Sequence, residues 1–181
     1  AYADAAEASF NAWQLFPSRA EAGFEAVSIN GVIERYDRCR AVLVELRRSS
    51  DLRVQRAAEQ QLSQVEPLAA STYKSKLEYA DAELERKRPN LDRVTQAYSD
   101  ARDLYPEKSE PRIGLAAMAV ASGSPEEAIE ILEAAAQAHS LVWQDLPKRA
   151  ELRTMADSED FQRFLEDTFG PRIAAIVVAR S

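Results

Sequence analysis

The chain has 181 residues, a formal net charge of −7 and only five glycines, and Ala is its most abundant residue. This length fits one domain or one array of short repeats, and the composition favours helices over a β-sandwich and over disorder. The negative charge argues against nucleic-acid binding, because phosphate contacts need clustered Lys and Arg. The one basic run, at 85–88, is typical of a solvated helix end.

One Cys and one His exclude an intrachain disulfide and a Cys/His zinc site, and no cofactor is expected. Cys39 is expected to be an inert packing residue, and His139 to lie at a helix C-terminus in a capping or surface role. The longest apolar run, 173–179, is too short to span a bilayer. We expect a soluble protein whose compartment stays open: the cytoplasm is slightly favoured, and a periplasmic or secreted protein also fits.

Apolar residues at steps of three and four predict helices along nearly the whole chain. The expected helices, in chain order, span 2–15, 20–33, 36–48, 51–65, 67–88, 94–105, 110–122, 125–138, 145–154 and 158–169. Pro67 favours a break at 65–67, because proline inside a helix costs about 3 kcal/mol. A single helix kinked at Pro67 is the alternative, since the apolar stripe stays in phase across it.

Two helix starts and one helix end carry specific signals. Ser124 and Glu127 form a capping box before and after Pro125, and Gly123 allows the sharp turn that precedes them. Ser158 caps the helix at 158–169, which Gly170-Pro171 closes. The apolar tail at 173–179 fits a short strand or a short helix, and we expect it to fold back against 158–169.

A pattern of small, large and small or medium residues at steps of four and three recurs in the second helix of successive helix pairs. Its members are Cys39, Leu43 and Leu46; Val94, Tyr98 and Ala101; and Ala128, Leu132 and Ala135. Val94 and Ala128 lie 34 residues apart, as do Ala5 and Cys39. A small residue lets two helices approach closely, and the large residue fills the gap to the next pair.

This pattern, with the glycine turn at 123 and Pro106 after the earlier helix, resembles the tetratricopeptide repeat. The resemblance implies an all-α fold of antiparallel helix pairs, stacked as a right-handed α-solenoid with one extra helix. It further implies an array over 1–144, capping helices over 145–169 and an apolar tail over 170–181. Ala5, Ser9, Ala12 and Pro17 look like a second helix without its partner, which suggests a fragment of a longer array.

The chain also departs from the family pattern. Asp81 and Ala82 stand where the family has a Leu-Gly pair, and the interval from Cys39 to Val94 is longer than one repeat. The extra residues are assigned to the additional helix at 51–65.

In this family the first helices line a concave groove that holds a peptide or a partner helix. The residues implied for that groove are Glu21, Phe24, Ser28, Gly31, Lys76, Tyr79, Glu83, Arg86, Ile113 and Ala117. One subfamily clamps a C-terminal carboxylate with Lys, Asn and Arg side chains. Phe24, Ser28 and Ala117 stand at such positions here, which argues against that mode of binding.

The sequence contains no G-x-S-x-G, H-E-x-x-H, P-loop or G-x-G-x-x-G motif, so an enzyme is not expected. The predicted function is a non-catalytic scaffold that binds a peptide or helix of another protein. The alternatives are a regulatory or substrate-recruiting segment of a larger enzyme, and a module that self-assembles into homo-oligomers through exposed end faces.

Overall fold

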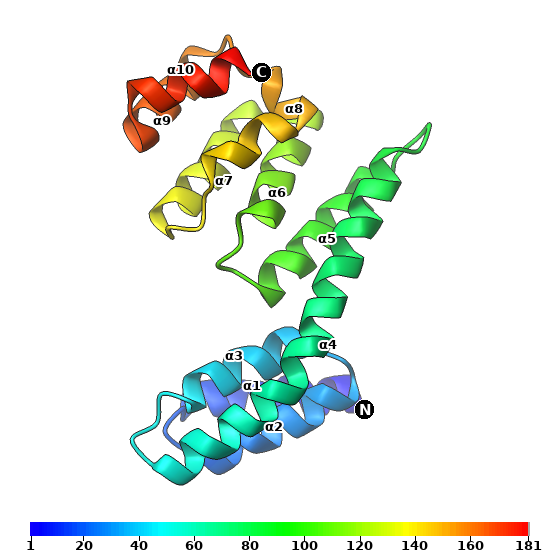
Figure 1. Ribbon diagram of the computed structural model, residues 1–181. Helices are drawn as coiled ribbons and strands as arrows, with labels where there is room; N and C mark the ends of the chain where they lie inside the picture. The colour runs from blue at the N-terminus through cyan, green and yellow to red at the C-terminus, as the bar shows by residue number, and fades with distance from the viewer. Residues whose placement is uncertain (181) are drawn as a thin grey trace. The chain divides into compact units, whose positions relative to one another are not determined.

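The computed structural model describes residues 1–180, which form helices and no strand, as Figure 1 shows. The all-α prediction is therefore confirmed for this part of the chain. Two compact units divide the chain after Tyr73, a division that the sequence did not predict. Unit 1 contains α1 (Tyr2–Leu15), α2 (Ala20–Val32), α3 (Tyr36–Leu46) and the first part of α4 (Leu52–Leu84). Unit 2 contains the rest of α4, α5 (Leu91–Leu104), α6 (Ser109–Ala121), α7 (Pro125–Gln137), the 3₁₀ helix η1 (Trp143–Lys148), α8 (Ala150–Arg153), α9 (Glu159–Phe169) and α10 (Pro171–Ala179).

In unit 1, α2 packs against both α1 and α3. Cys39 and Leu43 of α3 share one apolar core with Ala58 and Leu62 of α4. The contact between α1, α2 and α3 is close at Gly23, where a Cβ atom would lie 2.9 Å from Leu46 Cδ1. Glycine at this position therefore allows the helices to approach.

The break that the sequence predicted at 65–67 is wrong, because α4 continues through Pro67. The apolar stripe stays in phase on both sides of the proline, with Leu62 and Ala69 both buried. On the preceding turn, Arg40 Nε of α3 donates a hydrogen bond of 2.9 Å to Glu66 Oε1. Burial of the stripe on either side offsets the roughly 3 kcal/mol that an internal proline costs.

Unit 2 is built on α5, α6 and α7, in which each helix packs against the next. Tyr98 of α5 is fully buried, and its ring lies where a side chain on Gly114 of α6 would be. A Cβ atom at Gly114 would come within 2.6 Å of the ring. The Tyr98 ring thus fills the space that a side chain at position 114 of the next helix would otherwise occupy.

The residues of the recurring pattern are buried in three of the four helices where the sequence predicted it. All nine have at most 4 % of their surface exposed, and they belong to α3, α5 and α7: Cys39, Leu43, Leu46, Val94, Tyr98, Ala101, Ala128, Leu132 and Ala135. By contrast, Ala5 and Ala12 of α1 are exposed. The burial fits helical repeats, and the right-handed tetratricopeptide-like stacking remains a prediction.

The C-terminal part differs from the predicted helix at 145–154. A 3₁₀ helix, η1, contains Pro147, and the four-residue α8 follows it as a separate element. The predicted cap at Ser158 is confirmed, since its Oγ accepts a hydrogen bond from the Phe161 N–H. The tail is helical and α10 packs against α9, which confirms that it folds back; Gly170 makes the turn with a φ of 82°.

The side-chain cap predicted for Ser124 does not form. Ser124 does stand at the N-cap of α7, after Gly123 with its φ of 85°, but its hydroxyl makes no capping hydrogen bond. Its ψ of 67° departs from the extended backbone of Ser158, whose ψ is 125° and whose hydroxyl does cap. A cap needs the extended conformation to direct the side chain at the free N–H groups.

Candidate functional site

The residues that the family resemblance implied for a groove fall in both units. Glu21, Phe24 and Ser28 lie on α2 of unit 1, where Phe24 is half-buried and the other two are exposed. In unit 2, Ile113 and Ala117 are at most 1 % exposed and belong to the apolar core. These two side chains are therefore unavailable to a partner, because α6 is surrounded in its own unit.

Two of the implied residues, Lys76 and Tyr79, line a surface cleft between α4 and α5. This cleft, the α4–α5 cleft, has a volume of about 420 Å³. It is lined by Ser75, Lys76, Tyr79, Arg93, Gln96, Ala97 and Asp100. The α5 residues of the lining follow one another at steps of three, one and three, so they share one face of that helix. Sequence analysis missed Arg93, Gln96 and Asp100, although their spacing marks one polar stripe.

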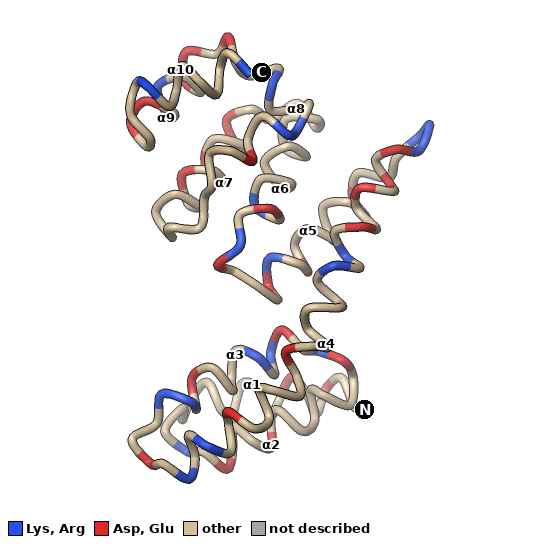
Figure 2. Tube along the Cα trace, viewed as in Figure 1, with Lys and Arg blue, Asp and Glu red and all other residues tan. Residues whose placement is uncertain are grey.

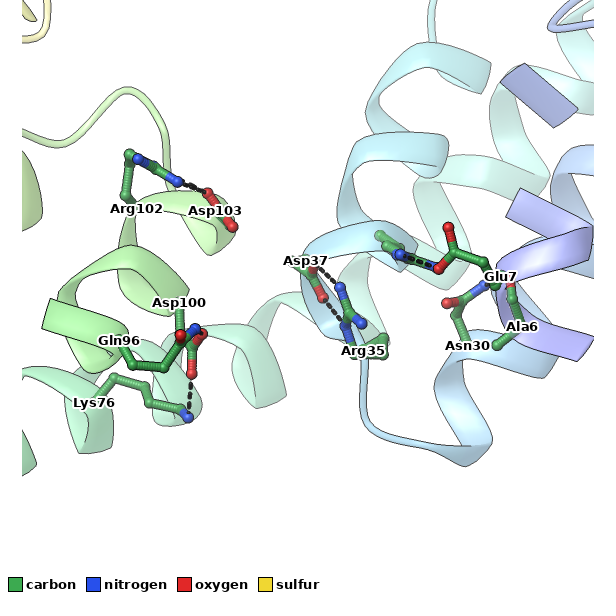
Figure 3. A network of polar contacts seen from close by, with 11 residues as sticks. Ala6, Glu7, Asn30, Arg35, Asp37, Lys76, Gln96, Asp100, Arg102 and Asp103 are labelled. Carbon is green, nitrogen blue, oxygen red and sulfur yellow. Dashed lines mark hydrogen bonds and ion pairs between the residues drawn. The ribbon is translucent and has the colours of Figure 1, made fainter. Parts of the chain in front are cut away.

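One wall of the α4–α5 cleft is held by a carboxylate with two donors. Lys76 Nζ forms an ion pair of 2.5 Å with Asp100 Oδ2, and Gln96 Nε2 donates a hydrogen bond of 2.7 Å to Asp100 Oδ1. Figure 3 shows both side chains directed at Asp100. The charge of Asp100 is therefore compensated within the cleft.

Arg93, on the same helix as Asp100, differs from it in having no charged partner for its side chain among residues 1–180. Its backbone N–H donates to Asn90 Oδ1, the cap of α5, while its guanidinium has no ion-pair partner within residues 1–180. Tyr79 lies in the same lining with 41 % of its surface exposed. The α4–α5 cleft thus offers an aromatic face next to an uncompensated positive charge.

Gly31 lies on α2 with Glu21, Phe24 and Ser28. Glu83 and Arg86, the last two implied residues, make contacts at the turn after α4. Glu83 is only 3 % exposed; its Oε1 accepts a hydrogen bond of 3.1 Å from the Asn90 N–H, and its Oε2 pairs with Arg86 at 2.8 Å. A buried carboxylate with these partners holds the two ends of the turn together. Neither residue lines the α4–α5 cleft.

Asp81, the residue that departs from the family pattern, joins three parts of unit 2. Its Oδ1 accepts hydrogen bonds from the Tyr98 hydroxyl at 2.9 Å and from Arg149 Nη1 at 2.8 Å. Burial raises the pKa of Tyr98 above its usual range, so this hydroxyl remains a proton donor at neutral pH. The Arg149 guanidinium also lies over the Tyr98 ring, which makes this a packing contact as well as a polar one.

Cys39 is buried, as expected of a packing residue. Its thiol donates to the Val27 carbonyl at 3.4 Å, and burial raises the thiol pKa to about 11. A thiol with such a pKa carries almost no thiolate at neutral pH. His139 is exposed after α7, with a φ of 53°. No cluster of His, Cys, Asp and Glu suited to a metal ion occurs in the described part of the chain.

No protein-family model matches the sequence, and no curated protein or solved structure is significantly similar to it. The likeness to tetratricopeptide repeats thus depends on the residue pattern alone. Within residues 1–180, no helix combines the length and apolar character needed to cross a membrane.

Proposed function

We propose that this chain is a non-catalytic interaction module that binds a peptide segment of another protein in the α4–α5 cleft. One observation carries this proposal: exposed Tyr79 lines the same concave surface as Arg93, whose guanidinium has no ion-pair partner in the described part of the chain. Tyr and Arg dominate the energetics of protein interfaces, because each combines a large contact area with directional hydrogen bonding.

The lining also indicates the chemistry of the bound segment. Arg93 would pair with an Asp or Glu side chain or with a C-terminal carboxylate. Tyr79 would pack against an apolar or aromatic neighbour of that acid, and Ala97 leaves room for it. With Asp100 compensated by Lys76, the cleft favours an acidic segment over a basic one.

The same contacts support a binding role over a catalytic one. Asp100 is the one carboxylate of the lining, and it already accepts from Lys76 and Gln96. Both oxygens of this carboxylate already have a partner, so neither is free to take up a proton from a bound substrate.

Selection from a library of random peptides displayed on phage, with the full chain immobilised, tests the proposal. The affinity of a selected peptide would then be measured by fluorescence anisotropy for the wild type, Tyr79→Ala and Arg93→Ala. We expect acidic peptides to be enriched, and each substitution to weaken binding about tenfold or more. Arg172→Ala is the matched control, since Arg172 is exposed on α10 outside the cleft, and it should bind as the wild type does.

Two results would contradict the proposal. One is the failure of any peptide to be enriched over a surface without protein. The other is that the selected peptides bind Tyr79→Ala and Arg93→Ala as tightly as the wild type, which would place the binding surface elsewhere.

A further inference from the structure

A second cleft of unit 2 lies between α7 and α9 and has a volume of about 310 Å³. It is lined by Glu126, Ile129, Glu133, Asp160, Arg163, Phe164, Asp167 and Thr168. We propose that this α7–α9 cleft binds a basic, amphipathic helical segment of another protein. This surface and its ligand differ from those of the α4–α5 cleft, so the inference does not depend on the function proposed above.

The rim of the α7–α9 cleft carries negative charge that nothing in the described chain compensates. Glu126, Glu133 and Asp167 have no ion-pair or hydrogen-bond partner for their carboxylates within residues 1–180. Asp160 is paired with Arg163 at 3.2 Å, and Arg163 is the one cation of the lining. Three of the four carboxylates are thus free to pair with cations from outside.

The acidic character extends along the helix that supplies one wall. α7 has four glutamates and neither lysine nor arginine in its sequence, PEEAIEILEAAAQ. Figure 2 marks the acidic and basic positions along this part of the trace. A surface of one sign attracts ligands of the opposite sign and suppresses binding of anionic segments.

The floor of the cleft is apolar and firmly held. Phe164 is 4 % exposed, and its ring packs against Phe161 at a centroid distance of 6.2 Å and edge-on against Phe169 at 6.4 Å. Ile129 of α7 is half-buried beside it and belongs to the same core. Because these side chains are fixed by their neighbours, the floor is preorganised and needs little reordering to accept an apolar side chain.

An apolar floor between acidic walls matches one kind of ligand. A helix that presents Leu or Ile on one face, with Lys or Arg three or four residues away on either side, would fill the floor and pair with both walls. A bare cation does not suit the cleft, since its carboxylates form no group able to hold a metal ion among the described residues. The basic run of this chain, at 85–88, has no apolar side chain to fill the floor of a second copy.

A defined probe tests the proposal on the full chain. The probe is a fluorescein-labelled, amidated peptide of about 14 residues with Leu at helical spacing on one face and Lys on the flanks. A second peptide with Glu in place of each Lys is its control. Fluorescence anisotropy should detect binding of the Lys peptide and none of the Glu peptide. The affinity should decrease as salt screens the carboxylates.

Charge-neutralising variants locate the binding. Glu133→Gln with Asp167→Asn removes one free carboxylate from each wall, and we expect at least about a tenfold loss of affinity. The matched control is Glu130→Gln with Glu166→Gln, which removes the same number of charges from the same helices outside the cleft. This control should lower the affinity for the Lys peptide by less than about twofold, because it changes only the net charge of the protein. Thermal unfolding verifies that both double variants fold.

Equal losses in the two double variants would overturn the proposal, because the peptide would then respond only to overall charge. Equal binding of the Glu peptide would overturn it as well. Self-association of the wild type in sedimentation, removed by Arg86→Gln with Arg88→Gln, would assign the cleft to a second copy instead. Tyr79→Ala should leave the Lys peptide unaffected, so this inference and the proposed function can fail separately.

Discussion

The two units use the same small–large–small pattern in their cores but close those cores differently. Large apolar side chains remain exposed on unit 1 at Tyr2, Leu15, Phe16, Val32, Leu52 and Leu68. On the described residues of unit 2 they are Tyr79 and Val142. The difference follows from α9 and α10, whose Phe164, Leu165 and Val177 share the core of Leu132.

The small–large–small pattern buries the contact between paired helices, but the outer faces of the first and last helices need a separate cover. The pattern buries the seam between paired helices, and it does so equally in the two units, where Leu43 and Leu132 are each 0 % exposed. It does not cover the outer faces of the first and last helices, which need a further element. We therefore expect unit 2 to be the more stable unit, since it leaves less apolar surface in water.

The largest effects are expected from Leu43→Ala and Leu132→Ala, one at the same pattern position in each unit. Each variant leaves a cavity in a fully buried site and should cost about 2–5 kcal/mol. Hydrogen exchange followed by mass spectrometry should show increased exchange confined to α2 and α3 for the first, and to α6 and α7 for the second. A uniform increase along the chain in either variant would mean that the units do not unfold separately.

Deleting residues 171–181 should leave unit 2, like unit 1, with large apolar side chains exposed to water. α10 places Ala174 and Val177 in the core and packs Ile173 and Val178 against it. Their loss should reduce stability by on the order of 3 kcal/mol and expose the aromatic side chains of α9. Urea denaturation measures the first effect and binding of an apolar dye the second. Unchanged stability in a chain that loses self-association would show that the tail is an intermolecular contact.

Two glycines distinguish close helix contact from open surface. Gly114→Ala should cost about 1–3 kcal/mol, because the new Cβ would meet the Tyr98 ring at 2.6 Å. Gly31→Ala on α2 has no atom within 4 Å of its Cβ, and it should stabilise the chain by about 0.4–1 kcal/mol. Thermal unfolding of both variants provides the test. Equal shifts would disprove close packing at Gly114.

The smallest predicted effect compares two serines at helix starts in unit 2. Ser158→Ala should cost about 1 kcal/mol, because the hydroxyl caps α9, whereas Ser124→Ala should cost little, because the Ser124 hydroxyl makes no cap. Urea denaturation of the two variants resolves a difference of this size. If Ser124→Ala were the more damaging, the backbone geometry at α7 would not govern capping.

The family pattern predicted only part of the α4–α5 cleft. Lys76 and Tyr79 were implied by position on a first helix, and they do line the α4–α5 cleft. Arg93 and Asp100 belong to a second helix, so the family pattern gave no reason to select them. Ile113 and Ala117 were implied in the same way, but the helices that surround α6 bury them.

The sequence by itself determined the helical class, the glycine turns at 123 and 170, the cap at Ser158 and the buried pattern residues. These features depend on residues within a few positions of one another, and helical periodicity expresses them directly. Near neighbours also decide the cap at Ser124, but through a backbone angle that residue type does not specify.

The tertiary structure decided the continuity of α4 through Pro67 and the shape of both clefts. A proline favours a break by a fixed local cost, whereas packing of Leu62 and Ala69 opposes it with an energy that depends on partners distant in the sequence. The sequence likewise shows which charged residues the chain contains, but it does not show which of the charges in the clefts are compensated by a partner. Lys76 reaches Asp100 across 24 residues, while Glu133 has no cationic partner among residues 1–180, because only the packed helices determine which side chains meet.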